Sequence, residues 1–270
     1  MRDSRTSAVG IVVSATALLA LTVTSLGSAP RDWPPFLRAT DEYPAPIASA
    51  VRRLWTDATF TRTVTVDPAP VPLSFYLRFV DAPDLAAAAA RHLRLTTYEI
   101  KVLGDDWYEA GGGGAQGVYR VLVRDDGRRV VLSWGTHRGS ILGTIGGSAL
   151  TRLEFTADGG RTAQRLVVNV IIDHGVAAGI TRTILPLFGR FVDRKLTEGF
   201  RTTAAAAAWA HAKRPEFCAW LGAAFTADRR SQLLAVFDEC ALAVRPSPGA
   251  SHTAGSAREA PDAGDFLNEV

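Results

Sequence analysis

Within residues 97–204 the hydrophobic period changes once, from that of strands to that of a helix, and this change constrains the fold more than any other feature. Segments with strand character come first, separated by short turns such as Asp125-Asp126-Gly127. A stripe of apolar residues spaced three to five apart then runs from Ile180 to Ala204. Because antiparallel strands with short turns form a sheet with one apolar face, we expect that face to curl around the long helix.

The other elements follow from the same patterns. Alternating or β-branched residues predict strands over 60–66, 97–102, 118–124, 128–134, 149–155 and 165–172. Short helices are predicted over 71–80, over 83–93 and near Pro46–Thr56. Within the strand 118–124, Tyr119, Val121 and Val123 oppose Arg120 and Arg124.

This order of elements resembles the START-like (SRPBCC, Bet v 1-like) helix-grip superfamily over residues 58–212. The resemblance is carried by Thr63-Val64-Thr65-Val66-Asp67-Pro68-Ala69-Pro70, by Gly143-Thr144-Ile145-Gly146-Gly147-Ser148 and by Leu185-Pro186-Leu187-Phe188-Gly189-Arg190-Phe191. It implies an α+β helix-grip fold, a curved antiparallel β-sheet wrapped around a long C-terminal helix. It also implies a cavity between sheet and helix for lipids, sterols, polyketides or similar apolar molecules; some members are cyclases or aromatases.

Strand parity selects the side chains that should face the helix. The expected cavity residues are Tyr98, Tyr119, Val121, Trp134, Leu153, Phe155, Val168 and Val170 from the strands, and Phe188 and Phe191 from the helix. The alternative is a dry core made of the same residues. Aromatic side chains with polar tips on the inner face favour a cavity. Asn169 has the opposite parity and is expected to point outward.

The sequence contains no convincing catalytic, metal or cofactor motif. Gly112, Gly114 and Gly117 match a dinucleotide fingerprint by letter, but a strand follows them, so a loop between strands is the preferred interpretation. The histidines lack zinc-ligand spacing. Asp173-His174, at the start of the long helix, is the most suggestive pair; His174 could act as a general base, although helix capping by Asp173 is the preferred interpretation.

The two cysteines, Cys218 and Cys240, fall in a predicted helical hairpin over residues 213–245. An even cysteine count in an exported protein favours a disulfide, and a pair of buried free thiols is the alternative. Residues 246–270 are rich in Pro, Gly, Ala, Ser and Asp, and we expect a disordered tail there.

The first 27 residues predict export. Arg2 and Arg5 precede an uncharged apolar run, residues 8–26, and small residues stand before a cleavage site after Gly27. The alternative is an uncleaved membrane anchor formed by residues 8–26. The expected location is periplasmic or extracellular. Residues 28–57 are expected to form an N-terminal extension that contains the short helix.

Composition limits the remaining function classes. The 47% of hydrophobic residues exclude a disordered protein, and a net charge of +3 gives no support to nucleic-acid binding. Three hypotheses remain. The first is an exported protein that binds a lipid or other hydrophobic molecule as a carrier or sensor. The second is a cyclase- or dehydrase-type enzyme that uses groups such as Tyr98, Tyr119 or His174. The third is a structural or interaction module with a filled core.

Overall fold

The computed structural model describes residues 32–139, 143–173 and 185–241, apart from the side chains of residues 185–192. The predicted N-terminal export segment and the predicted C-terminal tail lie outside these ranges. Among the described helices, none is long and apolar enough to cross a membrane.

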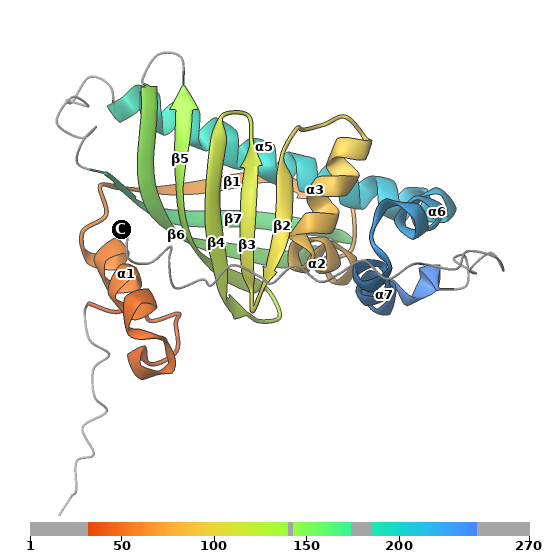
Figure 1. Cartoon of the computed structure of the whole chain (residues 1–270), viewed down its shortest axis with the longest axis horizontal. Coiled ribbons are helices and arrows are strands. Elements are labelled where there is room, and N and C mark those ends of the chain that lie inside the picture. The colour runs from red at the N-terminus through yellow and green to blue at the C-terminus, as the bar shows by residue number, and fades with distance from the viewer. Residues whose placement is uncertain (1–31, 140–142, 174–184, 242–270) are drawn as a thin grey trace, which may run out of the picture. The chain divides into compact units, whose positions relative to one another are not determined.

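A seven-stranded antiparallel sheet forms the centre of the fold, in the order β1-β7-β6-β5-β4-β3-β2 (Figure 1). Its strands are β1 (Phe60–Ala69), β2 (Glu99–Gly104), β3 (Trp107–Gly112), β4 (Ala115–Arg124), β5 (Arg128–Gly139), β6 (Gly143–Asp158) and β7 (Arg161–Ile172). From β2 to β7 each strand pairs with its neighbour in sequence, as short turns require. β1 pairs with β7 and forms one edge of the sheet, with Phe60 opposite Val170.

The sequence predicted every strand except β3. The sequence predicts a loop for the glycine-rich residues before Val118, but only Gly113 and Gly114 form one. Gly113 and Gly114 make a tight turn between β3 and β4 with positive φ angles of 58° and 83°, and Gly112, the last residue of β3, has a φ angle of 138°. An L side chain rarely adopts such angles, which explains the glycines at this turn. On either side of it, residues 107–112 and 115–117 belong to the strands.

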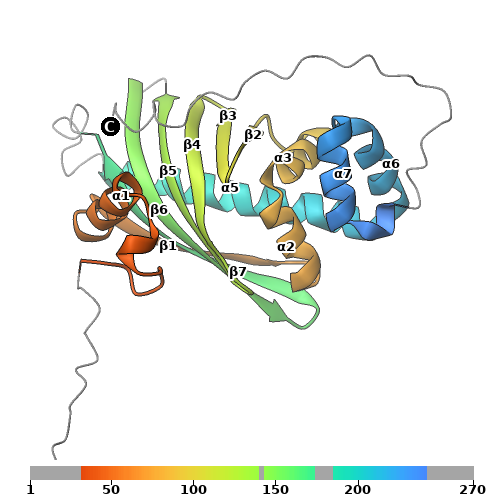
Figure 2. The same cartoon turned by 60° about the horizontal axis from the view of Figure 1, so that its bottom comes forward.

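One face of the sheet, here called the inner face, is covered by helices. α5 (Leu185–Ala212) lies along it, and α2 (Leu73–Asp81) and α3 (Pro83–His92) lie at one end (Figures 1 and 2). Phe155, Leu166 and Val168 of the sheet are buried in one core with Phe75 and Phe79 of α2 and with Phe200 of α5. This is the curved sheet gripping a long helix that the sequence predicted.

The C-terminal hairpin belongs to the same core. It consists of α6 (Arg214–Ala224), α7 (Ala227–Val236) and the 3-10 turn η2 (Asp238–Cys240). Phe217 and Phe237 pack on Phe79 with ring centroids 5.8 and 5.5 Å apart. Cys218 and Cys240 form a disulfide with their Cα atoms 5.0 Å apart.

An ion pair also fixes the hairpin to α3. Nε and Nη2 of Arg229 in α7 each donate to Asp84 in the first turn of α3, at 2.7 and 2.6 Å. Only 9% of the Asp84 side chain is exposed, so removing Arg229 would leave a carboxylate without its bidentate partner.

The opposite face, here called the outer face, carries α1 (Ala45–Thr56), the helix expected near Pro46–Thr56. Its apolar side packs on alternate residues of β5, β6 and β7. The buried set is Ile47, Val51 and Leu54 with Val130, Leu132, Leu150 and Ile171. The short 3-10 turn η1 (Thr40–Glu42) precedes α1.

Candidate ligand cavity

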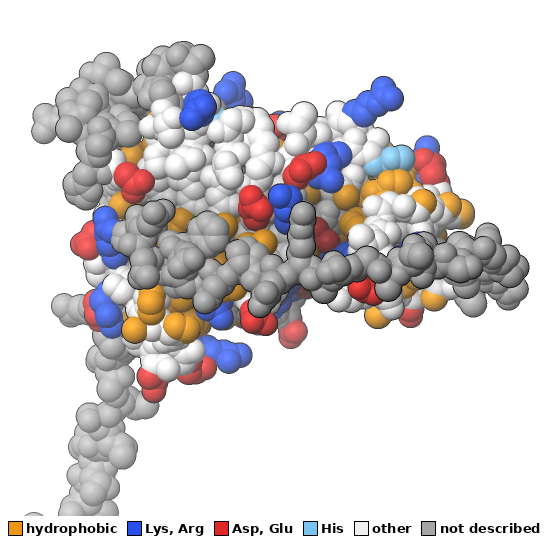
Figure 3. Space-filling model, viewed as in Figure 1, with side chains coloured by type: hydrophobic (Ala, Val, Ile, Leu, Met, Phe, Trp, Pro, Cys, Tyr) orange, Lys and Arg blue, Asp and Glu red, His pale blue; other side chains and the backbone are white. Residues whose placement is uncertain are grey.

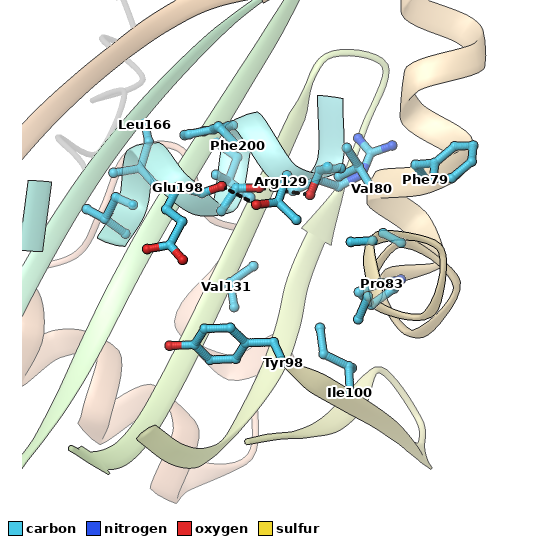
Figure 4. Close-up of a pocket in the computed structure, with 18 of the residues that line it drawn as sticks. Phe79, Val80, Pro83, Tyr98, Ile100, Arg129, Val131, Leu166, Glu198 and Phe200 are labelled. Atoms are coloured by element: carbon cyan, nitrogen blue, oxygen red, sulfur yellow. Dashed lines mark hydrogen bonds between the residues drawn. The ribbon is translucent and has the colours of Figure 1, made fainter. Parts of the chain in front are cut away.

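A cavity of about 400 Å³ lies between the inner face of the sheet and α5. Figure 4 shows Tyr98, Ile100 and Val131 on one side of it, Glu198 and Phe200 of α5 across from them, and Phe79, Val80 and Pro83 of α2 and α3 at its end. Most of the lining is aliphatic or aromatic. Further lining residues are Tyr76, Ala86, Ala87, Ala90, Thr96, Tyr119, Val121, Arg124, Arg129, Leu153, Phe155, Leu166, Lys195, Leu196, Gly199, Thr202 and Thr203.

A second cavity of about 330 Å³ lies further along the sheet, beside β3 to β7. Its lining includes Ser133, Ala149 and Val170, and it shares Tyr98 and Tyr119 with the first cavity. The two tyrosines therefore stand where the two spaces meet.

Five of the ten residues expected at the cavity line the larger space: Tyr98, Tyr119, Val121, Leu153 and Phe155. Val170 lines the second cavity instead. Val168 faces inward but is 3% exposed and packs within the core. The side chains of Phe188 and Phe191 lie outside the described part of the chain.

The structure places Trp134 differently from the expectation that it faces the helix. Its indole ring packs against the core of the outer face and stacks on Trp107 at 5.8 Å, although the residue also borders the second cavity. The reason is the strand register: Ser133, not Trp134, pairs with the inward Tyr119. Cross-strand partners share a face, and a shift of one residue reverses the face of every side chain.

A bulge in β4 also breaks the predicted alternation. Val121 pairs with Val131, but Val123 pairs with Val130, so one residue is inserted between them. After the bulge Val123 packs on the outer face, and Arg124, expected to point away from the helix, lines the cavity. Simple alternation over 118–124 could not reveal this insertion.

Asn169 does have outward parity, but it is not exposed. It is 8% exposed, and its side-chain oxygen accepts a hydrogen bond of 2.9 Å from Thr61 of β1. Burial of a polar side chain is tolerated here because it has a partner.

A charged cluster that the sequence did not indicate stands at the α2 end of the cavity. Asp81, the last residue of α2, accepts two hydrogen bonds of 2.7 Å from Arg129 and one of 3.0 Å from Arg124. Arg124 also donates to Asp106 and Tyr108, at 2.7 and 2.8 Å. These arginines are thus held by protein groups, and they tie α2 to β4 and β5.

The remaining charged lining residues, Lys195 and Glu198, are one turn apart on α5 and form an ion pair of 2.9 Å. Asp173 is exposed, and His174 lies outside the described residues. No group of three His, Cys, Asp or Glu side chains that could hold a metal occurs in the described ranges.

No protein-family model matches this sequence, and no curated protein is significantly similar to it. Solved structures do match. Ara h 8.0201 is 11% identical, with 55% of this chain and 98% of that chain covered at a TM-score of 0.39. A conserved protein from Geobacillus kaustophilus is 14% identical, with 56% and 93% covered at a TM-score of 0.37.

The di-domain ARO/CYC BexL from the BE-7585A biosynthetic pathway is 19% identical, with 58% of this chain covered at a TM-score of 0.39. The matched region spans about half of that protein, 52%. At such identities and scores these likenesses say nothing about ligand or activity. The chain's own topology gives the fold: a strand, two helices, six antiparallel strands and a long helix held against the inner face. This is the helix-grip fold of START-like proteins.

Proposed function

We propose that this protein binds an apolar small molecule, such as a lipid, in the cavity between the sheet and α5, and acts as a carrier or sensor of it. The observation that carries the proposal is the cavity itself. At about 400 Å³ it falls within the range of small-molecule sites, and a mostly apolar lining with a few polar groups is typical of them.

The charged groups of the lining support binding rather than acid–base chemistry. Arg124 and Arg129 are paired with Asp81, and Lys195 is paired with Glu198. An enzyme on this scaffold would need ionisable groups that converge on a substrate, whereas these groups satisfy one another.

An interaction module with a filled core is also disfavoured. Such a module would contact its partner through an apolar patch on the hairpin, residues 213–245. The hydrophobic residues Phe217, Leu221, Leu233 and Phe237 are instead each at most 1% exposed. In the described part of the hairpin, Val236 is the large hydrophobic residue that stands out, at 41%. On the face drawn in Figure 3, charges of both signs are interspersed and hydrophobic side chains gather in small groups.

Export belongs to the same proposal. The Cys218–Cys240 disulfide supports it, since such bonds persist in oxidising compartments. The predicted signal segment, which gave the first indication of export, lies outside the described residues.

Gly199 offers a way to test the cavity without damaging the core. It lies on the cavity side of α5, and a Cβ added there would meet no atom within 4 Å. We expect Gly199→Phe to fill the space and to keep or slightly raise the thermal stability, since glycine weakens a helix by about 0.5–1 kcal/mol. Ala205→Phe is the matched control, because Ala205 is exposed on α5 and does not line the cavity.

The measurement is native mass spectrometry of the full chain after incubation with a lipid extract. The proposal predicts a bound mass on the wild type and on Ala205→Phe, and loss of that mass on Gly199→Phe. Equal binding by all three proteins, or no binding by the wild type, would refute it.

A further inference from the structure

Four tyrosines face the inner side of the sheet or line its cavities, and two of them, Tyr76 and Tyr108, are buried and have hydroxyls engaged by the protein. The Tyr76 hydroxyl donates to Oε1 of Gln164 at 2.5 Å, and Gln164 in turn donates to the carbonyl of Asp67 at 3.3 Å. The Tyr108 hydroxyl accepts a hydrogen bond of 2.8 Å from Arg124. Both follow the rule that buried polar groups are hydrogen-bonded.

Tyr119 differs from both. Its hydroxyl has no hydrogen-bond partner among the residues that the structure describes. Its ring lies flat on that of Tyr108, with centroids 4.9 Å apart and 13° between the planes, because the two residues are direct cross-strand partners. The side chain lines both cavities. The fold therefore fixes the Tyr119 phenol at their junction, which half-buried Tyr98 also lines, without giving the Tyr119 hydroxyl a protein partner.

The state of this phenol sets what it can bind. Burial raises the pKa of Tyr119 far above its usual value, and the nearby Tyr108 and the negative charge of Asp84 act in the same direction, so the hydroxyl is protonated at neutral pH. A protonated phenol in an apolar site is a hydrogen-bond donor. The hydroxyl borders the cavities, so an oxygen acceptor on a bound molecule could pair with it there.

The charges around the cavity further limit which kind of hydrogen-bond acceptor a ligand can carry. A ligand carboxylate would need a cation, but Arg124 is already hydrogen-bonded to Asp81 and Asp106, and Lys195 is paired with Glu198. A neutral oxygen needs no cation, so a hydrogen bond from the Tyr119 hydroxyl is enough to bind it.

We infer that Tyr119 is a specificity-determining residue that selects apolar ligands carrying a neutral carbonyl or hydroxyl oxygen, which accepts a hydrogen bond from the Tyr119 hydroxyl. This inference rests on the proposed function of the cavity. Tyr119 would favour such ligands over pure hydrocarbons of equal size and over anions such as ionised fatty acids.

The test compares two ligands of the same shape, 2-acetylnaphthalene and 2-isopropenylnaphthalene, which differ in a carbonyl oxygen against a methylene group. Calorimetry gives the dissociation constants of both for the full chain and for Tyr119→Phe. We expect the preference for the ketone to fall about fivefold in the variant, as loss of one neutral hydrogen bond predicts. Tyr108→Phe is the control: it removes a neighbouring hydroxyl that does not line either cavity, and the preference should stay as in the wild type.

Each other outcome has a separate meaning. If both ligands bind and Tyr119→Phe leaves their ratio unchanged, the role of Tyr119 is refuted and the proposed function stands. If Tyr108→Phe lowers the ratio as much, the effect does not belong to Tyr119 and the inference is again refuted. If neither ligand binds the wild type, the proposed function fails, and the inference fails with it.

Discussion

Neighbouring residues of β5 meet very different surroundings on the two faces of the sheet. On the outer face, Val130 and Leu132 are fully buried beneath α1. On the inner face, Val131 between them borders a cavity of about 400 Å³. Because one strand supplies both faces, the difference arises from what covers them. A short helix packs closely on one side, and on the other a long helix lies against β1 and leaves a cavity beside β5. Close packing is the usual state of a protein interior, so the inner face is the exception to explain.

The largest expected effect concerns the hairpin that supports the inner face. Replacing both cysteines, as Cys218→Ala with Cys240→Ala, opens a loop with a sequence separation of 22 residues. Loops of this length correspond to about 3 kcal/mol of stability in the chain-entropy model. We expect a lower melting temperature by calorimetry, and faster hydrogen exchange in α2 and α3.

Exchange in α1 should stay unchanged in that double variant, since α1 packs on the outer face. Faster exchange in α1 than in α3 would show that the two faces are not supported separately.

The same substitution on adjacent residues tests the contrast in packing. Val130→Ala should cost about 2 kcal/mol, because the side chain is 0% exposed and its removal leaves a void. Val131→Ala should cost less than about 1 kcal/mol, because its side chain already borders open space. Urea unfolding of both variants gives the two values. Equal losses would mean that the inner face is packed as closely as the outer face.

The smallest effect appears at alkaline pH. Burial raises the pKa of Tyr76 and of Tyr119 above the ordinary value near 10. Below that value both residues are protonated whether the chain is folded or unfolded, so their contribution to stability is fully present. As the pH rises above it, only the unfolded chain ionises readily, and stability falls.

Absorbance of tyrosinate checks this expectation. We expect the Tyr76→Phe and Tyr119→Phe variants each to lose part of the signal that appears only on alkaline unfolding. If either tyrosine ionises near pH 10 in the folded chain, it is not buried as described.

Hydrophobic periodicity predicted much of this fold, because the positions of strands and helices depend on the pattern within each single segment. Alternation located the strands around the Asp125-Asp126-Gly127 turn, and the apolar stripe that ends at Ala204 located α5. β3 was missed because glycines occupy its end, and the shared core of the hairpin was missed because a segment does not show what it packs against.

The site was less predictable, since it depends on register. The bulge between Val121 and Val123 brings Arg124 inward, and the pairing of Ser133 with Tyr119 directs the ring of Trp134 outward. Both are relations between strands, and the sequence of one strand does not contain them. The charged cluster on Asp81 likewise joins residues far apart in the chain.

The central claim is that a ligand binds in the cavity on the inner face of the sheet and makes no contact with the core of the outer face. The most direct measurement is NMR of the full chain with labelled Val and Leu methyl groups and bound 2-acetylnaphthalene. The account predicts nuclear Overhauser effects from the ligand to Val131 and Leu153, and none to Val130 and Leu132. Contacts with Val130 or Leu132, or an unperturbed Val131 and Leu153 in the presence of saturating ligand, would contradict it.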